Sequence, residues 1–226
     1  MAVITIIGGH GKVALRTAPL LRDAGHEVRS LIRKQEQAPA VEGSGAVPVV
    51  KDATALDIDE IAEVFAGSDV IIWAAGAGGS GEADTWAIDR DAAIRTIDAA
   101  EQAGVRRYIM VSFFGSRMID GKYPGVDEGE GMYAYYNAKV QADAHLKESG
   151  LDWTIVGPSA LTLDEPSGMI AVDGSGASRD VEVPATSRGN VARVVAAAVG
   201  EEKAIGKQIS FHDGGTPVAE ALAALE

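Results

Sequence analysis

Three glycines lie directly after the first apolar run of the chain, in the stretch IIGGHGKVA at residues 6–14. They fit two spacings, Gly8-x-x-Gly11-x-x-Ala14 and Gly9-x-Gly11-x-x-Ala14. In either spacing one glycine allows a sharp turn out of a strand, and another removes a Cβ that would strike a bound pyrophosphate. The small third residue lets a helix pack closely on the strand. The feature therefore predicts a strand, a tight turn and a helix at the start of the chain.

A turn of this kind is typical of dinucleotide-binding proteins, in which the helix N-terminus offers N–H groups and a partial positive charge to phosphates. The alternative is an ordinary strand-to-helix turn. Because the glycines follow an expected strand and precede an expected helix, we favour the cofactor-binding interpretation. The residues expected to contact the cofactor here are Gly8, Gly9, His10, Gly11, Lys12 and Val13.

Short runs rich in Val and Ile recur along the chain, with longer helical patterns between them. Most of these runs are apolar throughout, which is typical of strands covered on both faces in a parallel sheet. The expected strands are 3–7, 27–32, 46–50, 70–73, 105–111 and 153–156. The expected helices are 11–24, 57–66, 83–103 and 132–149. This alternation predicts an α/β fold with a doubly wound, Rossmann-type parallel sheet.

The pattern changes after Val156, where Gly, Pro and Ser become frequent and apolar pieces are brief. We expect loops with one or two short strands in that stretch. The remaining expected elements are a helix at 188–200, a strand at 206–211 and a helix at 216–225. We interpret residues 1–226 as a single NAD(P)-binding domain, in which 157–187 and 206–226 contribute a small C-terminal substrate lobe. The lobe is expected over the carboxyl edge of the sheet, where open α/β sheets bind ligands.

Composition limits the classes of partner. The chain has 226 residues, of which 46% are hydrophobic, so it can bury a sizeable core. Its net charge of −13 argues against nucleic acid and anionic membranes as partners. It contains no cysteine, and its four histidines are dispersed, so we expect neither thiol chemistry nor a metal site. No leader pattern and no apolar run of ~18 residues is present, so we expect a cytoplasmic monomer or homodimer with a small-molecule substrate.

The end of the second expected strand, SLIRK, places Arg33 and Lys34 where NAD-binding proteins carry an acidic residue for the ribose. A guanidinium at this position can hold the 2′-phosphate of NADP, whereas a carboxylate would repel it. We therefore expect NADP(H) to be preferred over NAD(H). The alternative is that both side chains are solvated surface charges.

Two further strand ends fall on the same edge of the expected sheet. Asp52 either accepts a hydrogen bond from an adenine amino group, or forms an Asx-turn or helix cap, and the sequence leaves these alternatives open. The glycine-rich loop WAAGAGGSG follows the fourth expected strand. We expect Ala74, Ala75 and Gly76 in this loop to bind the cofactor, and Gly76 and Gly78 to let the backbone approach its ribose and diphosphate.

Tyr135 and Lys139 are four residues apart, which puts them on one face of the expected helix at 132–149. An ammonium beside a phenol favours the phenolate and lowers the pKa of the tyrosine from about 10. Such a tyrosine is a usable acid for a carbonyl oxygen near neutral pH. The alternative is a chance pair on a helix face.

With GGHGKVA, IRK, YYNAK and SGLDWTIVGPSALT, the chain resembles the short-chain dehydrogenase/reductase superfamily, in its atypical NAD(P)H-binding branch that includes NmrA-like and flavin-reductase-like proteins. The resemblance covers nearly the whole chain. It implies that Tyr135 is the proton donor and that Lys139 also holds the nicotinamide ribose. It further implies that Ser112 orients the substrate carbonyl and that Pro158 shapes the backbone beside the nicotinamide.

The chain departs from this branch at several positions. Phe113 and Phe114 occupy the places of the usual catalytic serines, so Ser112 is the first candidate for the orienting hydroxyl and Ser116 the second. The arginine that usually precedes the proline is missing from VGPSAL. In RGNVA, Asn190 replaces the usual aspartate of a helix start.

These features predict an NADP(H)-dependent oxidoreductase that transfers hydride to a small carbonyl, quinone or flavin-like acceptor. Two alternatives stay open: a non-catalytic NADP(H)-binding redox sensor, as among NmrA-like proteins, and an enzyme like the sugar-nucleotide epimerases and dehydratases. The loop at 115–131 is expected to be either a lid over the substrate or a disordered surface loop.

Overall fold

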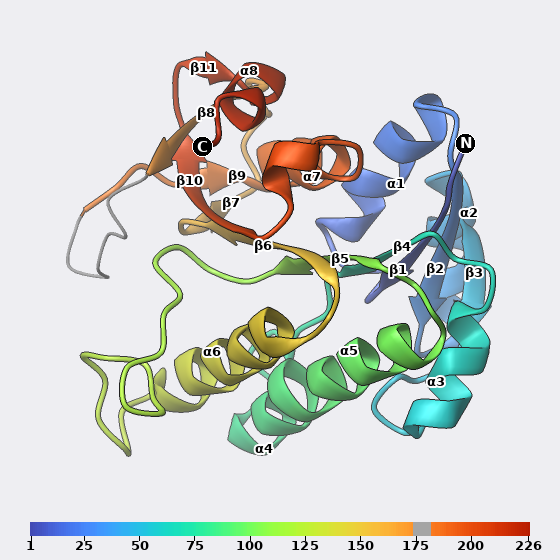
Figure 1. Ribbon diagram of the computed structural model, residues 1–226, viewed down its shortest axis with the longest axis horizontal. Coiled ribbons are helices and arrows are strands. Elements are labelled where there is room, and N and C mark those ends of the chain that lie inside the picture. The colour runs from blue at the N-terminus through green and yellow to red at the C-terminus, as the bar shows by residue number, and fades with distance from the viewer. Residues whose placement is uncertain (174–181) are drawn as a thin grey trace.

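The computed structural model describes residues 1–173 and 182–226, which form a nine-stranded sheet with helices on both faces (Figure 1). The order of its strands is β11-β8-β10-β6-β5-β4-β1-β2-β3. The strands are β1 (Val3–Ile7), β2 (Glu27–Ile32), β3 (Val47–Val50), β4 (Val70–Trp73), β5 (Arg107–Val111), β6 (Asp152–Pro158), β8 (Met169–Asp173), β10 (Lys207–Asp213) and β11 (Thr216–Pro217). The α/β fold with a doubly wound, largely parallel sheet is confirmed.

The neighbouring strands from β3 to β10 are all parallel. The order reverses at β1, which pairs with β2 on one side and with β4 on the other. Ile7, the last residue of β1, lies opposite both Leu31 and Trp73. Chains of this type bind ligands in the crevice beyond such a reversal, at the carboxyl ends of the strands.

Helices cover the sheet in two layers (Figure 1). One face carries α1 (Ala14–Asp23), α7 (Arg188–Ala198), and the short helices α2 (Ala38–Gly43) and α8 (Val218–Ala223). The other face carries α3 (Ile58–Phe65), α5 (Ala93–Gln102) and α6 (Tyr133–Glu148). The expected helix at 83–103 is composed of α4 (Glu82–Thr85), a π-helical segment (Trp86–Ala92) and α5. The remaining short pieces are 3-10 turns at Gln35–Gln37 and Glu202–Ala204.

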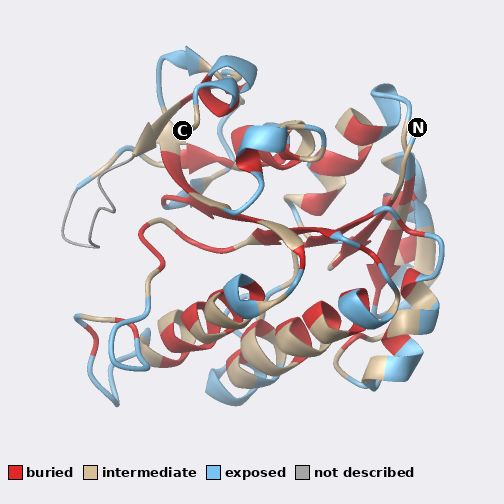
Figure 2. Ribbon diagram, viewed as in Figure 1, coloured by how far each residue is buried: buried red, intermediate tan, exposed pale blue. Residues whose placement is uncertain are grey.

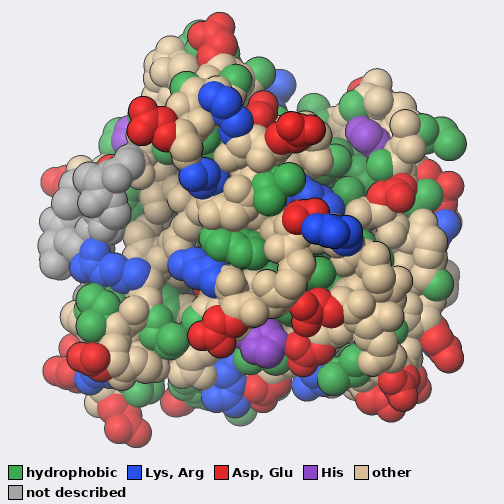
Figure 3. All heavy atoms as spheres, in the orientation of Figure 1, with side chains coloured by type: hydrophobic (Ala, Val, Ile, Leu, Met, Phe, Trp, Pro, Cys, Tyr) green, Lys and Arg blue, Asp and Glu red, His purple; other side chains and the backbone are tan. Residues whose placement is uncertain are grey.

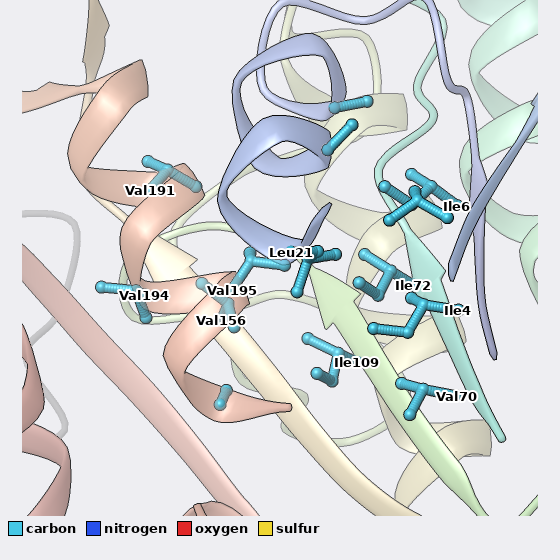
Figure 4. Close-up of a cluster of buried hydrophobic side chains, with 14 of the residues drawn as sticks. Ile4, Ile6, Leu21, Val70, Ile72, Ile109, Val156, Val191, Val194 and Val195 are labelled. Atoms are coloured by element: carbon cyan, nitrogen blue, oxygen red, sulfur yellow. The ribbon is translucent and has the colours of Figure 1, made fainter. Parts of the chain in front are cut away.

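Each central strand contributes side chains to two cores, one on each face of the sheet. Figure 4 shows one of them, with these labelled side chains between the sheet and the helices α1 and α7: Ile4, Ile6, Leu21, Val70, Ile72, Ile109, Val156, Val191, Val194 and Val195. The intervening residues Ile71, Trp73 and Met110 belong to the second core, against α3 and α5. Because both faces are covered, most residues of the central strands are buried (Figure 2). This double burial is the physical reason for their continuously apolar sequences.

The C-terminal part of the chain extends the same sheet. β8 pairs antiparallel with β10, and β11 pairs antiparallel with β8. β7 (Leu161–Thr162) and β9 (Thr186–Ser187) form a separate two-stranded ladder. Of the segments 157–187 and 206–226, expected as a lobe, β8, β10 and β11 therefore join the main sheet, while β7 and β9 do not. Residues 174–181 of that expected lobe lie outside the described residues.

Asn190 has a structural explanation in the first turn of α7. Its buried side-chain amide donates to Asp213 Oδ1 at 2.7 Å and to the Met169 carbonyl at 3.1 Å. Its amide oxygen accepts from the Gly168 N–H at 2.8 Å. An aspartate at this position would place a second carboxylate against Asp213, so an asparagine satisfies the contacts that an aspartate would break.

On the face shown in Figure 3, Asp and Glu side chains lie beside many of the Lys and Arg side chains, so the described positive charges form no continuous patch there. Within the described ranges, no helix is both long enough and apolar enough to cross a membrane.

Candidate active site

The glycine turn after β1 is required by the packing of the chain itself. Gly8 has a positive φ of 79°, and a Cβ there would lie 2.6 Å from the Cα of Ala75 in the loop after β4. A Cβ on Gly9 would collide with the side chain of Ser30 in β2. The glycines therefore let three neighbouring strand ends come together, in addition to any space that they leave for a phosphate.

The start of α1 offers free backbone donors. The helical ladder begins with the bond from the Leu15 N–H to the Gly11 carbonyl at 2.9 Å. The N–H groups of Lys12 and Val13 have no acceptor among the described residues. Together with the helix dipole, such unpaired N–H groups form a binding site for an anion.

A cavity of about 240 Å³ lies beside this turn, at the carboxyl ends of β1 to β4; we call it the strand-end cavity. Eight of the residues predicted to bind the cofactor line it: Gly8, His10, Gly11, Arg33, Asp52, Ala74, Ala75 and Gly76. The predicted residues Gly9, Lys12, Val13 and Lys34 lie near the cavity in the chain but outside its walls. The walls also include Gln37, Lys51, Thr54 and Trp73, which the sequence patterns did not single out.

Arg33 is positioned by a turn that the sequence did not reveal. Gln37 Oε1 accepts from the backbone N–H groups of Arg33 and Lys34, at 3.1 and 3.2 Å. This contact closes the chain after β2 and leaves the Arg33 side chain exposed at the cavity wall. The Arg33 guanidinium forms no ion pair with a described residue, so it is available to a ligand.

Asp52 forms the Asx-turn that was one of its expected alternatives. Its Oδ1 accepts from the Thr54 N–H at 3.0 Å and from the Thr54 hydroxyl at 2.7 Å. The residue also lines the strand-end cavity. Contact with an adenine stays a prediction, because the turn engages one oxygen of the carboxylate and leaves the other for a ligand.

Tyr135 stands between two further cavities. One, of about 510 Å³, lies between the glycine-rich segments at 77–82 and 129–134, each of which leads into a helix; we call it the glycine-lined cavity. The other, of about 360 Å³, has walls made largely of rings; we call it the aromatic cavity. Tyr135 lines both, and Ser112 and Pro158 line the aromatic cavity with it. The structure thus brings three of the predicted residues to one place.

Lys139 lies one turn after Tyr135 on α6 and is held by Asp89, a residue that the sequence analysis missed. Lys139 Nζ is 3.1 Å from Asp89 Oδ1, and it also donates to the Val111 carbonyl at 3.4 Å. Asp89 Oδ2 accepts from the Ala77 N–H at 3.0 Å. Asp89 belongs to the π-helical segment, a type of helix that is rare and frequently found at functional sites. No local motif marks Asp89, because its partners come from a distant loop and a distant helix.

The pKa of Tyr135 differs from the expectation. Burial is the largest influence and raises it, while the Lys139 ammonium acts in the opposite direction without prevailing. Burial would lower the pKa of Lys139, but Asp89, Tyr135 and Asp143 together raise it. The expected lowering of the Tyr135 pKa is therefore wrong, and its phenol is protonated at neutral pH.

Ser112 reaches the aromatic cavity with its proton already engaged. Its hydroxyl donates to Asp143 Oδ2 at 2.5 Å, and the hydroxyl of Ser116 donates to the same oxygen. Asp143 is fully buried on α6, and burial raises its pKa against the influence of these two donors. Both serine candidates thus serve one buried carboxylate, a relationship that spacing in the sequence does not show.

Phe113, in the place of a usual catalytic serine, belongs to an aromatic cluster. Its ring centroid lies 5.4 Å from that of Tyr123, 5.8 Å from that of Tyr135 and 5.0 Å from that of Tyr136. Tyr123 and Val126 are buried in this cluster, and both come from the loop at 115–131. The loop is therefore anchored against α6, which argues against a disordered surface loop; its action as a lid stays a prediction.

These features fit a nicotinamide dinucleotide, because free N–H groups and a cavity lie where a parallel sheet reverses its order. The chain matches the family described as NAD(P)H-binding over residues 8–202. The chain belongs to this NAD(P)H-binding family. The resemblance to the atypical short-chain dehydrogenase/reductases is confirmed with it. No group of three or more His, Asp or Glu side chains within residues 1–173 and 182–226 is arranged to hold a metal ion.

The chain matches several relatives over nearly its whole length. It is 34% identical to a protein of Bacillus subtilis described as an uncharacterized sugar epimerase, YhfK, over 97% of this chain and 98% of that protein. A solved structure from Bacillus halodurans, provisionally described as an NAD-dependent epimerase/dehydratase, is 34% identical with a TM-score of 0.86, and the match covers 98% of this chain and 99% of that one. The oxidoreductase ylbE from Lactococcus lactis is 31% identical with a TM-score of 0.81, and covers 99% and 96% of the two chains.

Proposed function

We propose that the protein is an NADP(H)-dependent oxidoreductase that reduces a small carbonyl, quinone or flavin-like acceptor. The position of Tyr135 carries this proposal. Its side chain lines two adjoining cavities, and its hydroxyl has no hydrogen-bond partner among the described residues. A protonated phenol that faces a cavity is free to donate to a ligand oxygen.

Each part of the site has a task in such a reaction. When bound, the dinucleotide supplies a hydride, with its two electrons, to the acceptor. The N-terminus of α1 and Arg33 hold phosphate groups, and Asp89 keeps the Lys139 ammonium beside Tyr135. The Tyr135 hydroxyl then gives its proton to the acceptor oxygen, which completes the addition of one hydride and one proton.

The two cavities beside Tyr135 bear on the other candidate functions. Their described walls carry acidic residues, Glu82, Asp89 and Glu130, but no lysine or arginine. A nucleotide sugar brings a diphosphate that needs cationic partners, so these walls disfavour it despite the name of the Bacillus subtilis relative. The sensor stays the second candidate, because the Ser112 proton is engaged by Asp143 and is not available to orient a carbonyl.

The cofactor preference is tested by titrating the protein with NADPH and NADH and following their fluorescence. We expect NADPH to bind at least ~10-fold more tightly, a difference of about 1.4 kcal/mol. Arg33→Ala is expected to weaken NADPH about 10-fold and to leave NADH nearly unchanged, because a charge-assisted bond to a phosphate contributes about 1.5–3 kcal/mol. The matched control is Lys34→Ala, whose side chain lies outside the cavity wall. Equal binding of NADH and NADPH by the unaltered protein would remove the proposed preference.

Turnover is tested by following NADPH oxidation with a panel of carbonyls, quinones and flavins. With an acceptor that reacts, Tyr135→Phe is expected to lower kcat at least ~100-fold and to leave NADPH affinity within twofold, as for loss of a general acid. Tyr133→Phe is the matched control, since Tyr133 lies on the same helix and lines only the glycine-lined cavity. NADPH binding without turnover of any acceptor would favour the sensor.

A further inference from the structure

Two serines line the aromatic cavity, and the protein holds the proton of each. Ser112 donates to Asp143 Oδ2 at 2.5 Å. Ser159 donates to the Pro184 carbonyl at 2.6 Å, and its Oγ also lies 2.8 Å from the Thr186 hydroxyl, which occupies one of its lone pairs. A hydroxyl has one proton and two lone pairs, so a serine that donates to the protein can only accept from a ligand.

The proton of Ser112 is held especially firmly. Its acceptor is a carboxylate, and charge-assisted hydrogen bonds are stronger than those to a neutral carbonyl. The Asp143 carboxylate receives a second hydroxyl from Ser116, and it lies one helical turn from Lys139 and one from Lys147. A neutral substrate carbonyl therefore does not take the Ser112 proton away from Asp143.

The other residues that line the aromatic cavity restrict the chemical class of its ligand further. Phe113, Phe114 and Leu161 present apolar surface, and no charged side chain is among the described lining residues. Such walls favour a flat, uncharged ring. The Tyr135 hydroxyl has a free proton, so it can donate a hydrogen bond to one ligand oxygen, whereas Ser112 can only accept one from a ligand donor.

We propose that the aromatic cavity binds a flat, uncharged ring that carries an O–H or N–H group, and that this group donates to Ser112 Oγ. Asp143 is the positioning residue that keeps the Ser112 lone pairs directed to the ligand. The placement of the reacting oxygen at Tyr135 rests on the proposed function, whereas the preference for a donor at Ser112 is a property of the cavity alone.

The probes for this preference are 2-naphthol and 2-fluoronaphthalene. They have the same ring and nearly the same size, but only the naphthol has a proton to donate. Their dissociation constants are measured by ligand fluorescence with the full-length protein, with and without saturating NADP⁺. The ratio of the two constants is compared between variants, because this comparison cancels the different hydration of the free probes.

In Ser112→Ala, the ratio of the dissociation constant of 2-fluoronaphthalene to that of 2-naphthol is expected to fall at least fivefold, as for loss of one hydrogen bond. Ser116→Ala is the matched control and keeps the ratio, since Ser116 binds the same carboxylate outside the aromatic cavity. Asp143→Asn also keeps it, because an amide oxygen still accepts from Ser112. Asp143→Leu frees the Ser112 proton, so the ratio is expected to fall as it does in Ser112→Ala.

Thermal unfolding establishes which variants are folded, and Ser112→Ala with Asp143→Asn suffices if the leucine variant does not fold. An unchanged ratio in Ser112→Ala, or a lost ratio in folded Asp143→Asn, overturns the proposal. The outcome is separate from that of the proposed function. A donor preference without NADPH turnover defeats only the reductase, and turnover without a donor preference defeats only this inference.

Discussion

Asp89 and Lys139 form a buried ion pair, with 3.1 Å between carboxylate and ammonium and side chains only 2% and 9% exposed. Removing one partner of such a pair leaves an uncompensated charge, which costs about 3–5 kcal/mol. We therefore expect Asp89→Ala to lower the free energy of unfolding by that amount in urea titrations. The control is Asp91→Ala, which breaks a partly exposed pair with Arg90 on the same helical segment and is expected to cost less than about 1 kcal/mol. Similar losses of unfolding free energy in the two variants would contradict the role of Asp89 as the partner of a buried ammonium.

The pH profile of reduction follows from the burial of Tyr135. Because burial raises its pKa, the phenol stays protonated through neutral and mildly alkaline pH. Any loss of kcat/KM caused by ionisation of Tyr135 is then expected above the ordinary tyrosine pKa of about 10. The measurement is the rate of acceptor reduction from pH 6 to 10 at saturating NADPH. An alkaline decline centred near pH 8, with the fold intact, would show that Lys139 prevails over burial after all.

The buried carboxylate of Asp143 makes stability depend on pH. Its pKa is raised in the folded state, so the folded protein binds more protons than the unfolded chain. Its contribution to stability is therefore greatest at low pH and declines as the pH rises through the folded-state pKa. Asp143→Asn escapes this decline, so its Tm is expected to exceed that of the unaltered protein at pH 8, with the gain vanishing near pH 4. Asp91→Asn, at a partly exposed position, serves as the control, and a gain that is constant with pH would contradict the prediction.

Substitutions at Gly8 and Gly78 distinguish the cost of a strained backbone conformation from the cost of a steric collision. Both have positive φ, of 79° and 61°, but a Cβ on Gly8 meets Ala75, whereas a Cβ on Gly78 meets open space. We expect Gly78→Ala to cost about 1–2 kcal/mol from the backbone conformation alone. Gly8→Ala adds a collision with backbone and is expected to cost at least about 2 kcal/mol more. Urea unfolding without cofactor measures both, and equal costs would mean that the strand ends move apart easily.

Much of the fold was predictable because its signals are local. The limits of β1, β2 and β4 match the expectation, since strands covered on both faces are apolar throughout. The short helix α2 was missed because six residues, with Pro39 among them, show no helical periodicity. The π-helical segment was also missed, since a widened turn leaves no sequence signature comparable to a cap.

The candidate site was predictable only where it follows motifs. The turn at Gly8, the side chain of Arg33 and the pair of Tyr135 and Lys139 were found by spacing. Asp89 and Asp143 were not, because each acts through contacts between elements that are distant in the chain. The same contacts decide the direction of the Ser112 proton and the pKa of Tyr135. Such properties are set by burial and tertiary packing, so spacing alone predicted the pKa shift with the wrong sign.

The wide turn between Trp86 and Ala92 determines in which direction the Asp89 side chain points relative to α5. A π-helical turn holds one more residue than an α-helical turn, and α5 continues directly from it into the core. If Arg90 or Asp91 were deleted, the ladder would close as an ordinary α-helix. Asp89 would then turn by about 100° relative to α5 and leave Lys139. The extra residue in the π-helical turn is therefore what allows Asp89 to reach Lys139.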